Sequence, residues 1–94
     1  MKAINMKSQR GNPVPNQFII EHGNKTYFQS YRTIIAVKDW KTGEITLDWA
    51  RWDYSRTTSK YLSIFLNETK AETQLNINSG SYALKNLNKL RHRI

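Results

Sequence analysis

Residues 52–66 constrain the fold more than any other segment, because an aromatic strand end runs there through hydroxyl residues into a short amphipathic helix. Apolar side chains recur at helical spacings in its second half: Tyr61, Leu62, Phe65 and Leu66. Ser55 or Thr57 can cap this helix, since a hydroxyl oxygen accepts a hydrogen bond from a free N–H of the first turn. The segment predicts a helix over residues 56–67 and indicates no reaction.

The residues before this helix alternate between β-prone runs and turns. The predicted strands occupy residues 17–22, 26–30, 33–38 and 44–49. Gly23 and Asn24 form the first turn, and Gly43 allows the positive φ of a later one. These patterns predict a small antiparallel sheet of three to four N-terminal strands.

The residues after the helix predict a second helix and a last strand. Thr69 and Glu72 match a capping box, so a short helix should extend from there to about Asn78. Gly80 can end it in a left-handed conformation, and residues 82–87 have mild strand character. The fold class is therefore α+β, with two short helices after the N-terminal strands and a possible C-terminal strand.

The chain length of 94 residues is typical of one domain. Pro13 and Pro15 restrict the backbone to extended geometry, so we expect a basic N-terminal arm over residues 1–15. Residues 16–88 should form a single α+β domain, and residues 89–94 a basic tail.

The formal charge of +8 is concentrated at the two ends of the sequence. The cations of residues 1–12 and 82–94 account for +7 of it: Lys2, Lys7, Arg10, Lys85, Lys89, Arg91 and Arg93. Such ends are either solvated tails or arms that lie along phosphates, and the sequence leaves both readings open.

The composition predicts a soluble intracellular protein. The chain has no cysteine, no apolar run long enough to span a membrane and no apolar N-terminal leader. We expect a cytoplasmic location, which is the host cytoplasm if the protein is phage-encoded. Three Trp, five Tyr and three Phe supply most of the material of a small core.

No group of residues forms a catalytic signature. His22 and His92 are the only histidines, and one lies at a hairpin end while the other lies in the tail. The carboxylates near the second hairpin and the helix entry are better explained by turns and charge pairing than by metal binding: Asp39, Glu44, Asp48 and Asp53. We therefore expect a protein that is not an enzyme and has no metal or cofactor.

The hydroxyl-rich helix entry allows two interpretations. Ser55, Thr57, Thr58 and Ser59, together with Arg56 and Lys60, could bind an anion or phosphate at the helix N-terminus. Helix capping explains most of the same pattern. Asp53 could cap the helix or pair with Arg51, Arg56 or Lys60.

The aromatic residues are mostly expected in the core, and Trp40 is the preferred exposed one because a turn position is hard to bury. Those that are exposed could form a stacking platform for unpaired bases, especially if Arg32, Arg51 and Arg56 line the same face. The rings considered are Trp40, Trp49, Trp52, Tyr27, Tyr31, Tyr54 and Tyr61. A turn tryptophan beside Lys38 and Lys41 is equally typical of a protein-binding hot spot.

Three blocks carry a resemblance to a known family: Phe-Gln-Ser-Tyr at 28–31, Ile-Ala at 35–36, and Trp-Asp-Tyr-Ser-x-Thr-Thr-x-Lys-Tyr at 52–61. In these blocks the chain resembles a family of small uncharacterised proteins carried by phages, prophages and other mobile elements. The resemblance covers roughly residues 16–88 and implies a genetic context without an assigned activity. That context favours proteins that bind nucleic acid or disable a host defence complex.

The sequence thus predicts a small non-enzymatic accessory protein that binds nucleic acid or a nucleoprotein complex through basic arms and an aromatic and basic face. DNA and RNA stay open as partners, as do a monomer and a homodimer. The alternative is an anti-CRISPR-like inhibitor of a host defence that acts by protein contact. The candidate binding residues are Lys2, Lys7, Arg10, Arg32, Trp40, Lys41, Arg51, Arg56, Lys60, Lys85, Lys89, Arg91 and Arg93.

Overall fold

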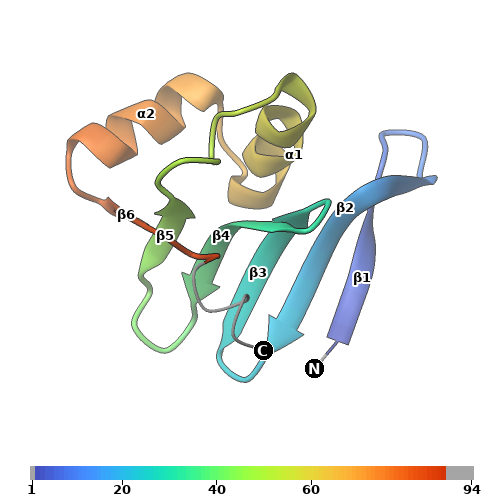
Figure 1. Cartoon of the computed structure of the whole chain (residues 1–94), viewed down its shortest axis with the longest axis horizontal. Helices are drawn as coiled ribbons and strands as arrows, with labels where there is room; N and C mark the ends of the chain where they lie inside the picture. Colours follow the sequence, from blue (N-terminus) through green and yellow to red (C-terminus); the bar gives the residue numbers. More distant parts are fainter. Residues whose placement is uncertain (1, 89–94) are drawn as a thin grey trace.

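A computed structural model describes residues 2–88 as one six-stranded sheet with two helices beside it (Figure 1). The elements are β1 Lys2–Lys7, β2 Pro13–His22, β3 Lys25–Ser30, β4 Thr33–Asp39, β5 Ile45–Asp48, α1 Arg56–Leu66, α2 Lys70–Asn78 and β6 Tyr82–Lys85. The strands lie in the order of the sequence, and all neighbours are antiparallel except β5 and β6, which are parallel. The predicted α+β class is confirmed, whereas the predicted strand number was too low.

Strand β1 is the element that the sequence analysis missed. Residues 2–7, expected in an arm, pair with β2 instead, and a bulge between Asn5 and Lys7 turns Met6 into the core, where it is 7% exposed. The other residues of β1 are exposed, and its alternation of apolar and polar residues is limited to the short run from Ile4 to Lys7. Pro13 is the first residue of β2, a position where a strand tolerates the missing N–H.

Both helices begin where the sequence predicted. Ser55 caps α1 and accepts a hydrogen bond from the Thr58 N–H, and Thr69 and Glu72 form the complete capping box of α2. Helix α1 ends at Asn67, whose left-handed backbone (φ 56°) stops the helix. Local capping chemistry therefore fixes the helix starts.

The hydrophobic core lies between the sheet and α1. Phe28 of β3 packs on Phe65 of α1 with ring centroids 5.8 Å apart, and Ile35 and Leu47 are fully buried beside them. Full burial of side chains of this size contributes about 2 kcal/mol each. The periodic face of α1 supplies the rest of the cover: Tyr61, Leu62, Phe65 and Leu66.

Two polar contacts define the direction of α1 over the sheet. The hydroxyls of Ser30, at the end of β3, and Thr58, in the first turn of α1, lie 3.0 Å apart. Lys38, near the end of β4, donates from Nζ to the Phe65 carbonyl at 2.7 Å. Helix α1 therefore begins over the end of β3 and runs towards the end of β4.

Burial lowers the pKa of Lys38, and the nearby Glu68 carboxylate opposes this shift.

The residues after β6 return to the sheet through Asp48 and Asn88. Buried Asp48 accepts hydrogen bonds from the N–H groups of Ala50 and Leu87 and from the Asn88 amide. Asn88 also pairs with both the N–H and the carbonyl of Ile34, which lies before the residues of β4 that pair with β5. This side chain thereby supplies the hydrogen bonds that a neighbouring strand would give.

Candidate nucleic-acid interface

The antiparallel order of the strands determines which loops lie together. The ends of β1, β3 and β5 and the starts of β2 and β4 share one end of the sheet, at the top of Figure 1. The Ser30 and Thr58 contact brings the start of α1 to the same end. The β2–β3 and β4–β5 turns lie at the opposite end.

All four arginines that the structure describes lie at the first of these ends. Arg10 lies in the β1–β2 turn, Arg32 in the β3–β4 turn, Arg51 in the loop after β5, and Arg56 at the start of α1. All four side chains are exposed. We call this end, defined by Arg10, Arg32, Arg51 and Arg56, the arginine end.

The acidic residues that the strand order places at the arginine end are held by other groups. Asp48 is 2% exposed and accepts the hydrogen bonds described above. Asp53 forms an ion pair with Lys70 and accepts a hydrogen bond from Ser59 at 3.3 Å. Glu21 and Glu44 are exposed, but they lie at the opposite end. Positive potential should therefore dominate at the arginine end.

Three exposed aromatic side chains accompany the arginines. Tyr31 is 51% exposed, Trp49 61% and Tyr54 43%. Each precedes an arginine by one or two residues in the sequence, and the Arg51 guanidinium lies 5.5 Å from the centre of the Tyr54 ring. An aromatic surface interleaved with cations is typical of proteins that bind nucleic acid.

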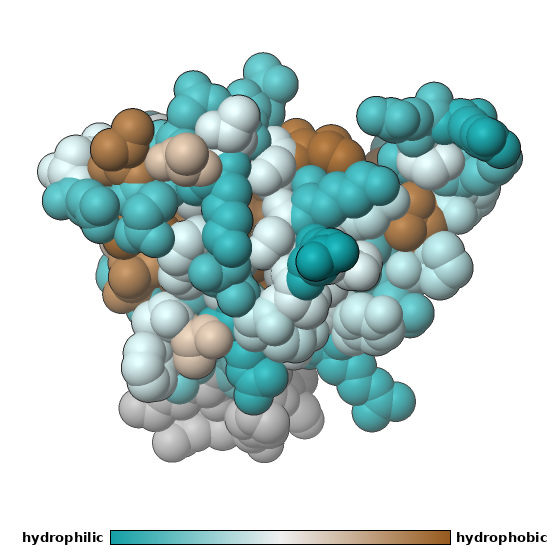
Figure 2. Space-filling model, turned by 90° about the horizontal axis from the view of Figure 1, so that it is seen from above, coloured by the Kyte–Doolittle hydropathy of each residue, from teal (hydrophilic) through white to brown (hydrophobic). Residues whose placement is uncertain are grey.

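Figure 2 looks down on the arginine end. Hydrophilic and near-neutral side chains cover most of this face, and hydrophobic groups show at its left edge and between the others. The β1–β2 hairpin stands apart at the right, as it does in Figure 1. Most of this face is therefore polar.

The hydroxyls at the α1 entry serve the fold more than a ligand. Ser55 caps the helix and donates to the Thr58 hydroxyl at 2.9 Å, and Thr58 is fully buried against Ser30. Ser59 donates to Asp53. Thr57 is the remaining exposed hydroxyl of the four. The capping interpretation is confirmed. Asp53 forms its ion pair with Lys70, whereas Arg51, Arg56 or Lys60 was the expected partner.

The other candidate binding residues do not all lie at the arginine end. Lys7 ends β1 and Lys60 lies in α1, while Lys85 ends β6, which runs parallel to β5 towards the arginine end. Lys2, Trp40 and Lys41 lie at the opposite end, so they cannot share one surface with the arginines. Lys89, Arg91 and Arg93 lie outside the described residues.

Trp40 is exposed, as expected from its turn position. It is 66% exposed, yet its indole N–H donates to Thr26 at 2.7 Å and the Lys38 ammonium lies 5.7 Å from its ring centre. The ring is therefore held in place on the surface.

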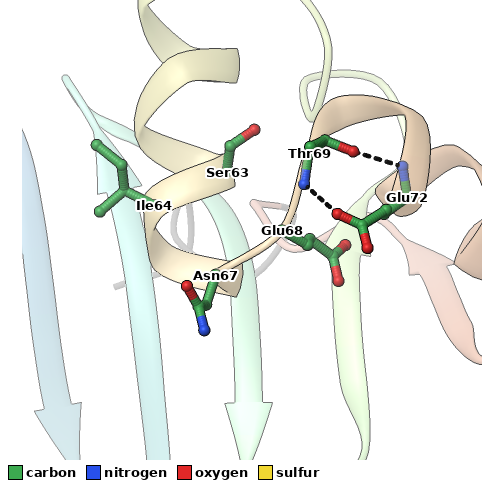
Figure 3. A pocket seen from close by; sticks show the side chains of 6 residues that line it. All are labelled: Ser63, Ile64, Asn67, Glu68, Thr69 and Glu72. Atoms are coloured by element: carbon green, nitrogen blue, oxygen red, sulfur yellow. Dashed lines mark hydrogen bonds between the residues drawn. The ribbon is translucent and has the colours of Figure 1, made fainter.

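An open groove of about 510 Å³ lies at the junction of α1 and α2 (Figure 3). Its carboxylates are occupied by the fold. Glu72 turns back to accept the Thr69 N–H, and Glu68 accepts hydrogen bonds from Thr73, Asn76 and the Tyr82 hydroxyl. Burial is the larger cause that raises the pKa of Tyr82, and its hydrogen bond to Glu68 raises it further. These hydrogen bonds therefore stabilise the α1–α2 junction.

Within residues 2–88, no group of three potential ligands could hold a metal ion, and no helix is long and apolar enough to cross a membrane. Asp39 accepts hydrogen bonds from the backbone of Lys41 and Thr42, which confirms its predicted role in the turn.

Tyr31 and Trp49 are among the rings that the sequence offers for stacking, but they are absent from the final candidate residues because an aromatic residue in a small chain is usually buried. The spacing of each ring to a following arginine was the available signal.

The fold and this surface define a small α+β protein whose sheet has one arginine-rich and aromatic end. The chain belongs to the family of unknown function DUF8033, whose family model matches residues 1–80. No curated protein and no solved structure matches the chain.

Proposed function

We propose that this protein binds nucleic acid, alone or within a nucleoprotein complex, through the arginine end and carries out no reaction of its own. The observation that carries the proposal is the gathering of Arg10, Arg32, Arg51 and Arg56 at one end of the sheet. Arginine presents a planar fork of donors that fits phosphate oxygens. The two acids there are occupied, so they do not repel a phosphate as free carboxylates would.

The proposal replaces the basic arm of the sequence analysis with a folded surface. Lys7 and Arg10 belong to the β1–β2 hairpin, which fixes them relative to the other arginines. A preformed surface loses less conformational entropy on binding than a disordered arm does. The phage or mobile-element origin suggested by the sequence blocks fits this function.

Two variants of equal charge test the proposal. The first replaces Arg10, Arg32 and Arg56 with Gln, and the second replaces Lys2, Lys25 and Lys41 with Gln; each removes three exposed cations. Binding of labelled DNA and RNA is measured by fluorescence anisotropy over a salt series. The arginine variant should bind at least tenfold more weakly at physiological salt, and each lost phosphate contact should flatten the salt slope by roughly 0.7 to 0.9.

The lysine variant shows whether location matters. It should lose less affinity, because its three cations lie at the opposite end of the sheet. Equal losses in the two variants would mean that total charge alone drives binding. No binding by the wild-type protein, even at low salt, would exclude the proposed function.

A second function is favoured by Trp40 at the opposite end. A held, exposed tryptophan beside lysines suits a protein-binding hot spot, as in an anti-CRISPR-like inhibitor that contacts a host defence protein. Trp40→Ala would then abolish capture of that partner from nuclease-treated host lysate. Capture that survives this substitution would contradict the role of Trp40.

A further inference from the structure

We infer that the arginine end binds single-stranded nucleic acid by stacking unpaired bases on Tyr31 and Trp49, an inference that rests on the proposed function. The chemistry shared by single-stranded DNA and RNA is a phosphate backbone with accessible base faces. Arg32 and Arg51 follow these two rings in the sequence and supply charge for the phosphates beside each stacked base.

The exposure of the two rings is the first observation. Phe28 and Phe65 show that this sheet can bury aromatic rings beneath α1, yet Tyr31 and Trp49 remain 51% and 61% exposed. Both lie where polypeptide strands end, Tyr31 in the β3–β4 turn and Trp49 directly after β5. At these strand ends about half or more of each side chain is open to solvent, which leaves room for a base to lie against the ring.

The backbone of Tyr31 is the second observation. Its φ of 58° is in the left-handed region, which costs energy for a residue with a large side chain. Two hydrogen bonds hold it there: its N–H donates to the Asn16 carbonyl at 2.6 Å, and its carbonyl accepts from the Gln29 amide at 2.7 Å. Glycine would fit this turn without strain, so the turn itself does not require a tyrosine at position 31. A role of the exposed ring would explain why a tyrosine stands there.

The backbone of Trp49 is anchored as well. Its N–H donates to the Lys85 carbonyl at 3.0 Å, while the adjacent, buried Asp48 is fixed by its hydrogen bonds to Leu87 and Asn88. Both rings are therefore attached to held segments of backbone. Fixed aromatic surfaces bind with a smaller entropy cost than mobile ones.

Duplex nucleic acid suits this surface less well. Its bases are stacked on one another, so Tyr31 and Trp49 would find no free base face and only phosphates would be contacted. A single strand offers bases to the rings and phosphates to the arginines together. The surface should therefore prefer single strands.

The test compares Tyr31→Gly and Trp49→Ala with the wild-type protein on single-stranded DNA, single-stranded RNA and duplex DNA of matched sequence. Each variant should lose about fivefold to 100-fold in affinity for single strands and little for duplex. Tyr31→Gly should keep or raise the melting temperature because it relieves the positive φ, which separates lost stacking from lost folding. Tyr31→Phe should retain wild-type affinity.

A control removes an equally exposed apolar side chain elsewhere. Leu75 of α2 is 66% exposed, and Leu75→Ala should leave single-strand binding unchanged. Equal or tighter binding of duplex, or full single-strand affinity in both ring variants, would overturn the stacking inference while leaving the proposed function in place. Failure of every polymer to bind the wild-type protein would overturn both. Comparison of the DNA and RNA strands identifies the preferred polymer.

Discussion

The two ends of the sheet both carry cations, but they differ in what their acidic residues do. At the arginine end the buried Asp48 accepts hydrogen bonds from the fold and Asp53 pairs with Lys70. At the opposite end Glu21 and Glu44 are exposed to solvent beside the lysines. The near-neutral charge of the body therefore conceals an uneven surface, and the total charge of a chain says little about where a partner binds.

The exposed aromatic residues show the same contrast. Tyr31 at the arginine end has a left-handed backbone that its neighbours hold in place. Trp40 at the opposite end is held through its side chain, by Thr26 and Lys38. A strained position that keeps a large ring is a stronger indication of ligand contact than a ring that also bonds to the fold.

The largest loss of stability is expected from substitution of Asp48, whose hydrogen bonds hold the loop residues of the arginine end in place. Asp48→Ala would remove the acceptor of the Ala50 and Leu87 N–H groups and one of the two acceptors of the Asn88 amide. We expect the free energy of unfolding to fall by about 3 kcal/mol, since several partly buried donors lose a partner and one fully buried donor would cost roughly 1 to 3 kcal/mol. Urea unfolding followed by circular dichroism measures this loss.

Asp39→Ala is the matched change at the opposite end. Asp39 also accepts two backbone N–H groups, but these bonds are exposed, so we expect a loss of about 1 kcal/mol or less. Losses of equal size at Asp39 and Asp48 would show that the aspartate hydrogen bonds stabilise the two ends equally. That result would contradict the difference in stability expected between the two ends.

Local patterns predicted the helices well because their signals lie within a few residues. Ser55, Thr69 and Glu72 are capping residues whose partners are three positions away, and all three act as expected. Strand β1 could not be predicted in this way. Its stability depends on pairing with β2 and on the burial of Met6, which are tertiary contacts without a local pattern.

The arginine end was only partly predictable for a related reason. Arg32, Arg51 and Arg56 could be named as candidates from their aromatic neighbours, but their joining with Arg10 depends on strand order. The same order separates Lys2 and Lys41 from them. The partner of Asp53 was missed because Lys70 lies 17 positions further along the sequence and meets it only when α2 is in place.

A smaller effect is expected at Tyr82, which stabilises an acid away from the arginine end. Its hydroxyl donates to Glu68 at 2.6 Å, so Tyr82→Phe should lower the free energy of unfolding by about 1 kcal/mol at neutral pH. The pKa of Tyr82 is raised in the folded protein, so its contribution is complete below about pH 10 and is lost at higher pH.

The pH dependence separates Tyr82 from Lys38. The pKa of Lys38 is lowered on folding, so its contribution to stability rises with pH up to its ordinary value. Removing the tyrosine should therefore flatten the loss of stability above about pH 10 in urea titrations. An equally steep alkaline loss in Tyr82→Phe would show that another group causes it.

The smallest effect tests the comparison most directly. Asp53→Asn removes a negative charge at the arginine end and breaks a surface ion pair with Lys70, so stability should change by about 0.5 kcal/mol or less. Affinity for nucleic acid should rise by roughly twofold at low salt, because one more cation there is uncompensated. Glu44→Gln makes the same change in net charge at the opposite end and should alter affinity less. Equal gains in both variants would mean that affinity depends on the total charge of the protein. That result would contradict the proposal that nucleic acid binds at the arginine end.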